Sequence, residues 1–339
     1  VPVTCLTIYV FRPFSITAFV SIRRHLGNLQ HSVPISKLAW DYEAVSAGNL
    51  ISSETYLCSS DTWQWCPRPH RKWKMNQEAN ELIGRCLAAA LLESAKPLIV
   101  FVETPYLHEF IKAVGSARSQ PLVLIAVSTD DSPLTRTLQD RIARLSNLKA
   151  CFATNLHWPQ RSLRSLFHPL PVGFCPKGLL RRESVIKRAR NTAAPWSQRD
   201  PRLLVLPMSD RGMLRRLYIR RLKAESYQGL VRVIDGRVDF GTFMSLLAEH
   251  QCVLSPIGRG YDCYRTWEAL AMGTVSLVLE DLTFDQRLHT EAGCGYIPRP
   301  EALSPEILSN VLLQLRSPQE HSRQVDIGYW KTLWRSHLT

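Results

Sequence analysis

The alternation of short apolar runs with amphipathic segments constrains the fold of this chain more than any other feature of its sequence. In the first half, stretches with helical periodicity alternate with short apolar runs rich in residues that favour β-strands. Such an alternation is typical of a parallel, doubly wound sheet with right-handed crossovers. The predicted order is a helix at 77–94, a strand at 98–102, a helix at 106–114, a strand at 122–127, a helix at 134–145 and a strand at 149–153.

The second half of the chain repeats this alternation. Its predicted strands lie at 203–206, 231–234, 252–254 and 275–279, and its predicted helices at 211–223, 240–250, 263–272 and 305–315. The helix at 305–315 and an aromatic C-terminal helix near 329–334 are candidates to close the second domain and pack back on the first. We therefore predict an α/β protein with two Rossmann-like domains. The predicted parts are an N-terminal domain at 1–175, a basic linker at 176–200, a C-terminal domain at 201–320 and a C-terminal helix at 321–339.

The length and composition of the chain fit two folded domains, and its charge favours an anionic ligand. The 339 residues are 45% hydrophobic and 21% charged, with a formal net charge of +13. Much of the positive charge lies at 177–190 and 202–223, which indicates either an anion site or a solvated basic surface. No zinc-finger spacing or RNP-like aromatic motif accompanies this charge, so we expect no nucleic-acid partner.

The clearest candidate site directly follows a predicted strand, at the edge where open α/β sheets bind their ligands. Residues 255–273 read S-P-x-G-x-G-x-D-x-x-R-x-W-E-A-L-x-x-G, beginning at Ser255. Gly258 and Gly260 would let the backbone approach a phosphate, and the helix after them would point free N–H groups at it. Asp262 is expected to be the N-cap of this helix.

The helix of this motif carries a pair of opposite charges. Arg265 and Glu268 are three residues apart and share one face, whereas Trp267, Leu270 and Ala271 are expected on the core-facing side. Arg265 could grip a diphosphate through two nitrogen atoms, and Glu268 could accept hydrogen bonds from ribose hydroxyls. The alternative interpretation is an ordinary ion pair on the surface of the helix.

The motif resembles a stretch of the exostosin-like glycosyltransferases, glycosyltransferase family 47 and its relatives. These proteins have a closely similar succession of strand, S-P-x-G, D-x-x-R-x-W-E-A-L and glycine. The similarity extends more weakly to TDDSP at 129–133, CFATN at 151–155 and HPLPVGF at 168–174, and so covers about residues 95–290. It implies a GT-B fold, in which the two Rossmann-like domains face a cleft. It also implies an inverting hexosyl- or pentosyltransferase.

The resemblance further implies the ligands and partners of the protein. The co-substrate would be a UDP-linked or similar nucleotide-sugar donor, and the acceptor a glycan or glycoprotein. By the family pattern, Arg265 and Glu268 would contact the donor, and Arg211 or Arg215 would help to hold its diphosphate. The resemblance also allows for a membrane anchor outside these 339 residues, and with an anchor or signal the protein would reside in the Golgi or the ER lumen.

Sugar transfer needs groups that stabilise the leaving diphosphate and a base that deprotonates the acceptor hydroxyl. The sequence has no D-x-D triplet and no C-x-x-C pair, so we expect no metal cofactor and assign the diphosphate to the helix N-terminus, Arg265 and Arg211. The candidate bases follow strands of the first domain: Asp130, Asp131 and Glu103. A GT-B-like nucleotide-sugar epimerase or hydrolase, and an inactive glycosyltransferase-like partner subunit, are the alternative functions.

Overall fold

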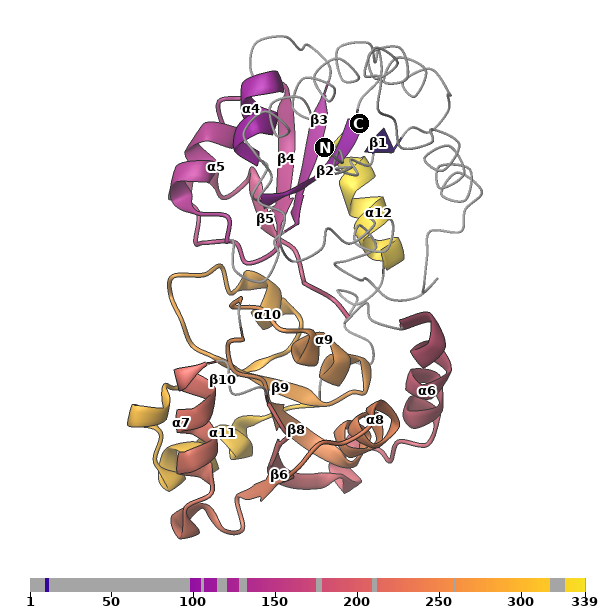
Figure 1. Ribbon diagram of the computed structural model, residues 1–339, viewed down its shortest axis with the longest axis vertical. Coiled ribbons are helices and arrows are strands. Elements are labelled where there is room, and N and C mark those ends of the chain that lie inside the picture. Colours follow the sequence, from indigo (N-terminus) through magenta and orange to yellow (C-terminus); the bar gives the residue numbers. More distant parts are fainter. Residues whose placement is uncertain are drawn as a thin grey trace, which may run out of the picture. The chain divides into compact units, whose positions relative to one another are not determined.

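A computed structural model describes residues 10–11, 98–104, 107–114, 121–127, 133–174, 179–208, 212–258, 260–317 and 327–338 (Figure 1). These residues form two compact units. The described residues up to His168 and from Trp330 onward belong to the first unit, and Pro169–Tyr329 to the second. The predicted helix at 77–94 lies outside the described residues.

The sheet of the first unit has the strand order β1-β2-β3-β4-β5. Strands β2, β3 and β4 run parallel, and β1 pairs with β2 in the antiparallel direction. Helix α4 lies between β2 and β3 in the chain and α5 between β3 and β4, which confirms the predicted β-α-β-α-β order. The bounds are β1 Val10–Phe11, β2 Leu98–Glu103, α4 Leu107–Val114, β3 Leu122–Val127, α5 Arg136–Ile142, β4 Leu148–Ala153 and β5 Phe167–Pro169.

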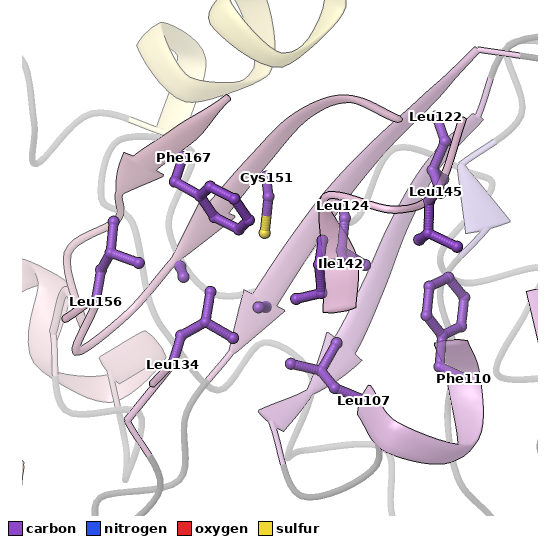
Figure 2. Packing of buried hydrophobic residues seen from close by; sticks show 12 residues of the cluster. Leu107, Phe110, Leu122, Leu124, Leu134, Ile142, Leu145, Cys151, Leu156 and Phe167 are labelled. Carbon is purple, nitrogen blue, oxygen red and sulfur yellow. The ribbon is translucent and has the colours of Figure 1, made fainter. Parts of the chain in front are cut away.

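One face of this sheet is covered by its two connecting helices. Figure 2 shows Phe110 of α4 and Ile142 of α5 packed against apolar side chains of the strands, among them Leu124 and Cys151. All four of these side chains are buried. Because side chains alternate along a strand, Phe152 points to the opposite face from Cys151. Both faces of the sheet are therefore apolar, as expected for a parallel sheet with helices on each side.

The C-terminal helix α12 (Ile327–Ser336) packs against Phe152 on that opposite face. Its ring meets the rings of Trp330 and Trp334 edge to face, with centroids 6.2 and 6.4 Å apart. Both tryptophans are buried. The C-terminal helix therefore packs on the first half of the chain, at the place for which the sequence made it a candidate.

The sheet of the second unit is parallel throughout, in the order β10-β9-β8-β6-β7. The predicted strands and helices of this half are present, and β10 and the short α10 are additions that the sequence pattern did not indicate. The strands are β6 Asp200–Val205, β7 Val231–Val233, β8 His250–Leu254, β9 Val275–Leu279 and β10 Gly295–Ile297. The helices are α6 Leu179–Asn191, α7 Met213–Leu222, α8 Phe240–Glu249, α9 Tyr264–Ala271, α10 Arg287–Glu291 and α11 Pro305–Gln314.

The region expected to be a basic linker, 176–200, contains helix α6 instead. This helix contacts α8 within the second unit, and its Ile186 and Ala189 are buried. The two apolar residues are three apart and so lie on one helical face, but the many basic residues around them hide this periodicity in the sequence. The chain passes from one unit to the other earlier, between His168 and Pro169.

The predicted α/β fold class is confirmed, since each unit is built on a largely parallel sheet with helices packed on it. Within the described ranges, no helix is both long and apolar enough to cross a membrane.

Candidate functional site

The candidate site is the connection from β8 to α9, residues 255–263, which we call the glycine turn. Ser255 is buried at its start, where its backbone N–H donates to Leu277 O at 2.9 Å and its hydroxyl lies 2.9 Å from the hydroxyl of Thr266. Gly258 N donates to Gly260 O at 3.0 Å, so the turn folds back on itself. These contacts hold the turn at the carboxyl edge of the sheet, where the sequence placed it.

Helix α9 begins one residue later than a cap at Asp262 would require. Its N-cap is Cys263, which makes no side-chain capping hydrogen bond. The prediction that Asp262 is the N-cap is therefore wrong. The carboxylate of Asp262 is instead directed into the protein, where it accepts a hydrogen bond from the indole Nε1 of Trp267 at 2.8 Å. Several hydrogen-bond donors contact this carboxylate in the interior, and together they stabilise it more than a single capping hydrogen bond would.

Arg215 of α7 reaches across to the glycine turn. Its Nε donates to Ile257 O at 3.0 Å, and its Nη2 lies 3.6 Å from Cys263 Sγ. A Cβ atom at position 258 would come within 2.5 Å of Arg215 Nη2, so Gly258 is required to leave room for this guanidinium. The other candidate on this side, Arg211, lies outside the described residues.

Arg265 is half-buried on the first turn of α9. Its Nη2 donates to Pro207 O at 2.9 Å, while its Nε is buried without a hydrogen-bond partner. Burial and, to a lesser extent, the nearby positive charge of Arg215 lower the pKa of Arg265 to about 10. The guanidinium is still charged at neutral pH, so two cationic side chains lie together at the N-terminus of the helix.

Glu268 follows Arg265 on the same helix and is only 7% exposed. Its negative charge favours the protonated state of Arg265, in opposition to the effect of Arg215. Trp267, Leu270 and Ala271 are buried as predicted, and Glu268 is buried with them. The alternative of an ordinary surface ion pair is excluded by this burial, because a surface pair would leave the carboxylate in solvent.

The far end of α9 is held by Arg199, which sequence reasoning did not single out. Its Nη1 donates to Met272 O at 2.9 Å and to Gly273 O at 3.0 Å. Carbonyl groups at the C-terminus of a helix have no partner within the helix, so a guanidinium there stabilises the helix end. The contact spans more than seventy residues, and no local pattern could have predicted it.

Of the three predicted catalytic carboxylate residues, the structure describes only Glu103. Glu103 is the last residue of β2, and its backbone pairs with Val127 at the end of β3. Asp130 and Asp131, which follow β3 in the sequence, lie outside the described residues. Among the residues that the structure does describe, no group of three or more His, Cys, Asp or Glu side chains could hold a metal ion.

Comparison with known proteins gives similarity in structure but not in sequence. No family model and no curated protein matches the chain. A UDP-forming α,α-trehalose-phosphate synthase from Burkholderia xenovorans, solved with glucose-6-phosphate, is 10% identical, with 77% of this chain and 75% of that chain covered and a TM-score of 0.37. A second structure of that enzyme is 11% identical, with 79% and 77% covered and a TM-score of 0.38. The enzyme from Burkholderia vietnamiensis is 10% identical, with 98% and 88% covered and a TM-score of 0.38. Similarity at this level does not bear on the substrate of this chain.

Proposed function

We propose that the protein is a nucleotide-sugar glycosyltransferase of the GT-B type that binds the diphosphate of its donor at the glycine turn. The observation that carries the proposal is the pair of guanidinium groups, Arg215 and Arg265, beside the N-terminus of α9. Free N–H groups and the positive end of a helix dipole favour an anion at such a place, and two arginines add both charge and hydrogen-bond donors. A diphosphate provides the matching negative charge.

In this proposal, different residues at the glycine turn and beside it bind different parts of the donor. Arg265, with its unpartnered Nε, and Arg215 bind the diphosphate, and Arg211 adds a third cation from the segment just before α7. Glu268 accepts hydrogen bonds from the ribose hydroxyls. Fixed positive groups of this kind stabilise the charge that grows on the leaving diphosphate, and they can do so without a metal ion.

The resemblance to exostosin-like enzymes supports a finer proposal. The donor is a UDP-sugar, the acceptor a glycan or glycoconjugate, and the anomeric carbon is inverted in one displacement. A carboxylate of the first unit deprotonates the attacking hydroxyl, with Asp130 the first candidate and Asp131 and Glu103 the next. Residence in the Golgi or the ER lumen would follow from such a role.

The donor site is tested by calorimetric titration with UDP. Arg265→Ala should raise the UDP dissociation constant about tenfold or more, because a charge-assisted contact to phosphate is lost. Arg202→Ala is the matched control: this arginine lies in the same unit but pairs with Asp200 at 2.6 Å, at the start of β6. A folded Arg265→Ala protein with unchanged affinity would place the nucleotide elsewhere.

The reaction itself is tested by incubating the protein with labelled nucleotide sugars and glycan acceptors, with and without EDTA. Transfer to an acceptor supports the proposal, and activity is expected to persist in EDTA. Free labelled sugar would indicate a hydrolase and an isomerised donor an epimerase, whereas binding without turnover would indicate an inactive partner subunit. Loss of activity in EDTA with recovery in manganese would contradict the proposed stabilisation of the leaving group.

The catalytic base is tested by Asp130→Asn. If Asp130 deprotonates the acceptor, the substitution should lower turnover by about 10²–10⁴-fold, the usual contribution of general base catalysis, and leave UDP affinity nearly unchanged. Asp131→Asn and Glu103→Gln are the parallel variants. Normal turnover of the Asp130 variant would transfer the role to whichever of the other two shows the loss.

A further inference from the structure

A buried carboxylate lies at the base of the glycine turn. The side chain of Asp262 is only 4% exposed. Its Oδ2 accepts from Val172 N at 2.8 Å, and its Oδ1 accepts from Cys263 N at 2.9 Å. Asp262 thus connects the N-cap of α9 with the segment that follows β5, ninety residues earlier in the chain. Asp262 is therefore the side chain that joins the glycine turn to this distant segment of the same unit.

His289 of α10 is a further donor to the same carboxylate. Its Nε2 lies 3.1 Å from Asp262 Oδ1. An ionised carboxylate can only accept, so Nε2 must carry the hydrogen. The other ring nitrogen, Nδ1, is buried without a hydrogen-bond partner, and a buried lone pair costs less there than an orphaned N–H would. Together the two atoms specify the Nε2–H tautomer.

Aromatic packing fixes the orientation of the His289 ring. The ring stacks on Trp267, with centroids 5.8 Å apart and 21° between the planes, and the ring of Tyr261 meets it edge to face at 5.4 Å. The residue is only 2% exposed. Trp267 and Tyr261 both belong to the 255–273 motif, so the histidine is enclosed by the segment that it orients.

We propose that His289 is a positioning residue for the donor site: it orients the Asp262 carboxylate and thereby holds the glycine turn and the start of α9 in their binding geometry. His289 itself does not contact the donor. The inference rests on the proposed function in so far as the turn binds a nucleotide, but the contact between His289 and Asp262 is independent of any ligand. Removing the donor nitrogen would take away one of the donors to Asp262 Oδ1 and leave Trp267 Nε1 and Cys263 N, so the buried carboxylate would be held less firmly and the turn would relax around it.

The binding test compares two substitutions at position 289 with one at a second buried histidine. His289→Leu fills the space without a donor, whereas His289→Gln keeps an N–H near the position of Nε2. His250→Leu is the control, because His250 is equally buried in the same unit but lies at the amino end of β8, away from the turn. In UDP titrations, His289→Leu should raise the dissociation constant about tenfold, and His289→Gln should restore most of the affinity. His250→Leu should lower thermal stability without weakening UDP binding.

A second measurement does not depend on UDP. Amide hydrogen exchange at Val172 and Cys263 should be about tenfold faster in His289→Leu than in the wild type, and unchanged in His250→Leu. If the wild type binds no UDP, the proposed function fails while the exchange result still decides the positioning role.

Two results would overturn the inference. The first is that His289→Leu binds UDP with wild-type affinity and shows wild-type amide exchange at Val172 and Cys263. The second is that UDP affinity is as low in His289→Gln as in His289→Leu. Should the leucine variant not fold, nitrogen NMR of the wild-type His289 ring decides: the Nε2–H tautomer is expected, and an Nδ1–H tautomer contradicts the contact.

Discussion

Individual ionisable residues of the second unit are buried or half-buried at both edges of its sheet, and each lies beside an oppositely charged group or a hydrogen-bond partner. At the carboxyl edge, Asp262 and Glu268 lie in the interior beside Trp267 and Arg265. At the amino edge, Asp200 binds Arg202, and buried His250 lies 3.6 Å from the Asp200 carboxylate. Burial costs a charged group its hydration, so the loss of a partner destabilises the protein more at these residues than at surface residues.

His250 should make the stability of the protein depend on pH. Burial lowers the pKa of His250 below its ordinary 6.5. The hydrogen bond to Leu246 O and the negative charge of Asp200 raise this pKa, but they offset the effect of burial only in part. As the pH falls below 6.5, the unfolded chain takes up a proton before the folded protein does, so the free energy of unfolding decreases. Arg202 lowers the pKa of Asp200 to about 2. The stability that Asp200 contributes to the folded protein is therefore lost only as the pH falls from 3.8 to 2.

This effect is measured by urea unfolding at pH 7.5 and pH 5.5. The wild type should lose stability between the two values, and His250→Gln should lose less. Equal pH dependence in both proteins would show that His250 does not titrate differently on folding.

At the scale of elements, the junction of β8 and α9 depends on contacts from outside its own segment. The strand, the glycines and the helix follow from the local sequence, but the space beside Gly258 is filled by Arg215 from α7. Gly258 therefore leaves room for the side chain of Arg215 as well as for any ligand. Arg199 in turn holds the other end of α9.

Gly258→Ala tests this arrangement. The new Cβ would lie 2.5 Å from Arg215 Nη2, so the guanidinium must move away from the turn. We expect UDP binding to weaken by about tenfold, as for the loss of one charged contact, with little change in secondary structure. Gly241→Ala is the control, since its Cβ would contact mainly the side chain of Asp239 at 3.1 Å, at the start of α8. Equal affinity of the two variants would contradict a role of Arg215 in donor binding.

At the scale of the whole molecule, the two ends of the described chain belong to the same unit. Helix α12 packs on Phe152 of β4 through Trp330 and Trp334, although the second unit lies between them in the sequence. Large aromatic side chains bury much apolar area, so this helix is part of the first unit's core. The first unit is consequently completed only after the second unit has been synthesised.

Trp330→Ala should destabilise the first unit selectively. Replacing a buried tryptophan by alanine typically costs about 3–5 kcal/mol, because apolar contacts are lost and a cavity remains. Amide exchange should therefore accelerate at Cys151 and Phe152 of β4, while amides of β8 in the second unit keep their protection. Arg335→Ala, an exposed position on the same helix, should change neither. Equal acceleration in both units would show that they unfold together.

The order and type of most elements, though not of α6, α10 and β10, can be inferred from the sequence, as can the strand–glycine–helix junction of the candidate site. Short apolar runs rich in β-favouring residues, such as 122–127, indicate buried strands, and a strand–glycine–helix junction is local in the chain, so both can be predicted from neighbouring residues. The tertiary structure alone decided which partners the polar side chains find. Asp262 was predicted to cap its own helix but binds Val172 N, and the expected linker folds as α6 on α8. Nor did any pattern indicate His289, which reaches Asp262 from α10. Local periodicity encodes which face of an element is apolar, whereas the donors that surround a buried charge come from distant segments and are brought together only by folding.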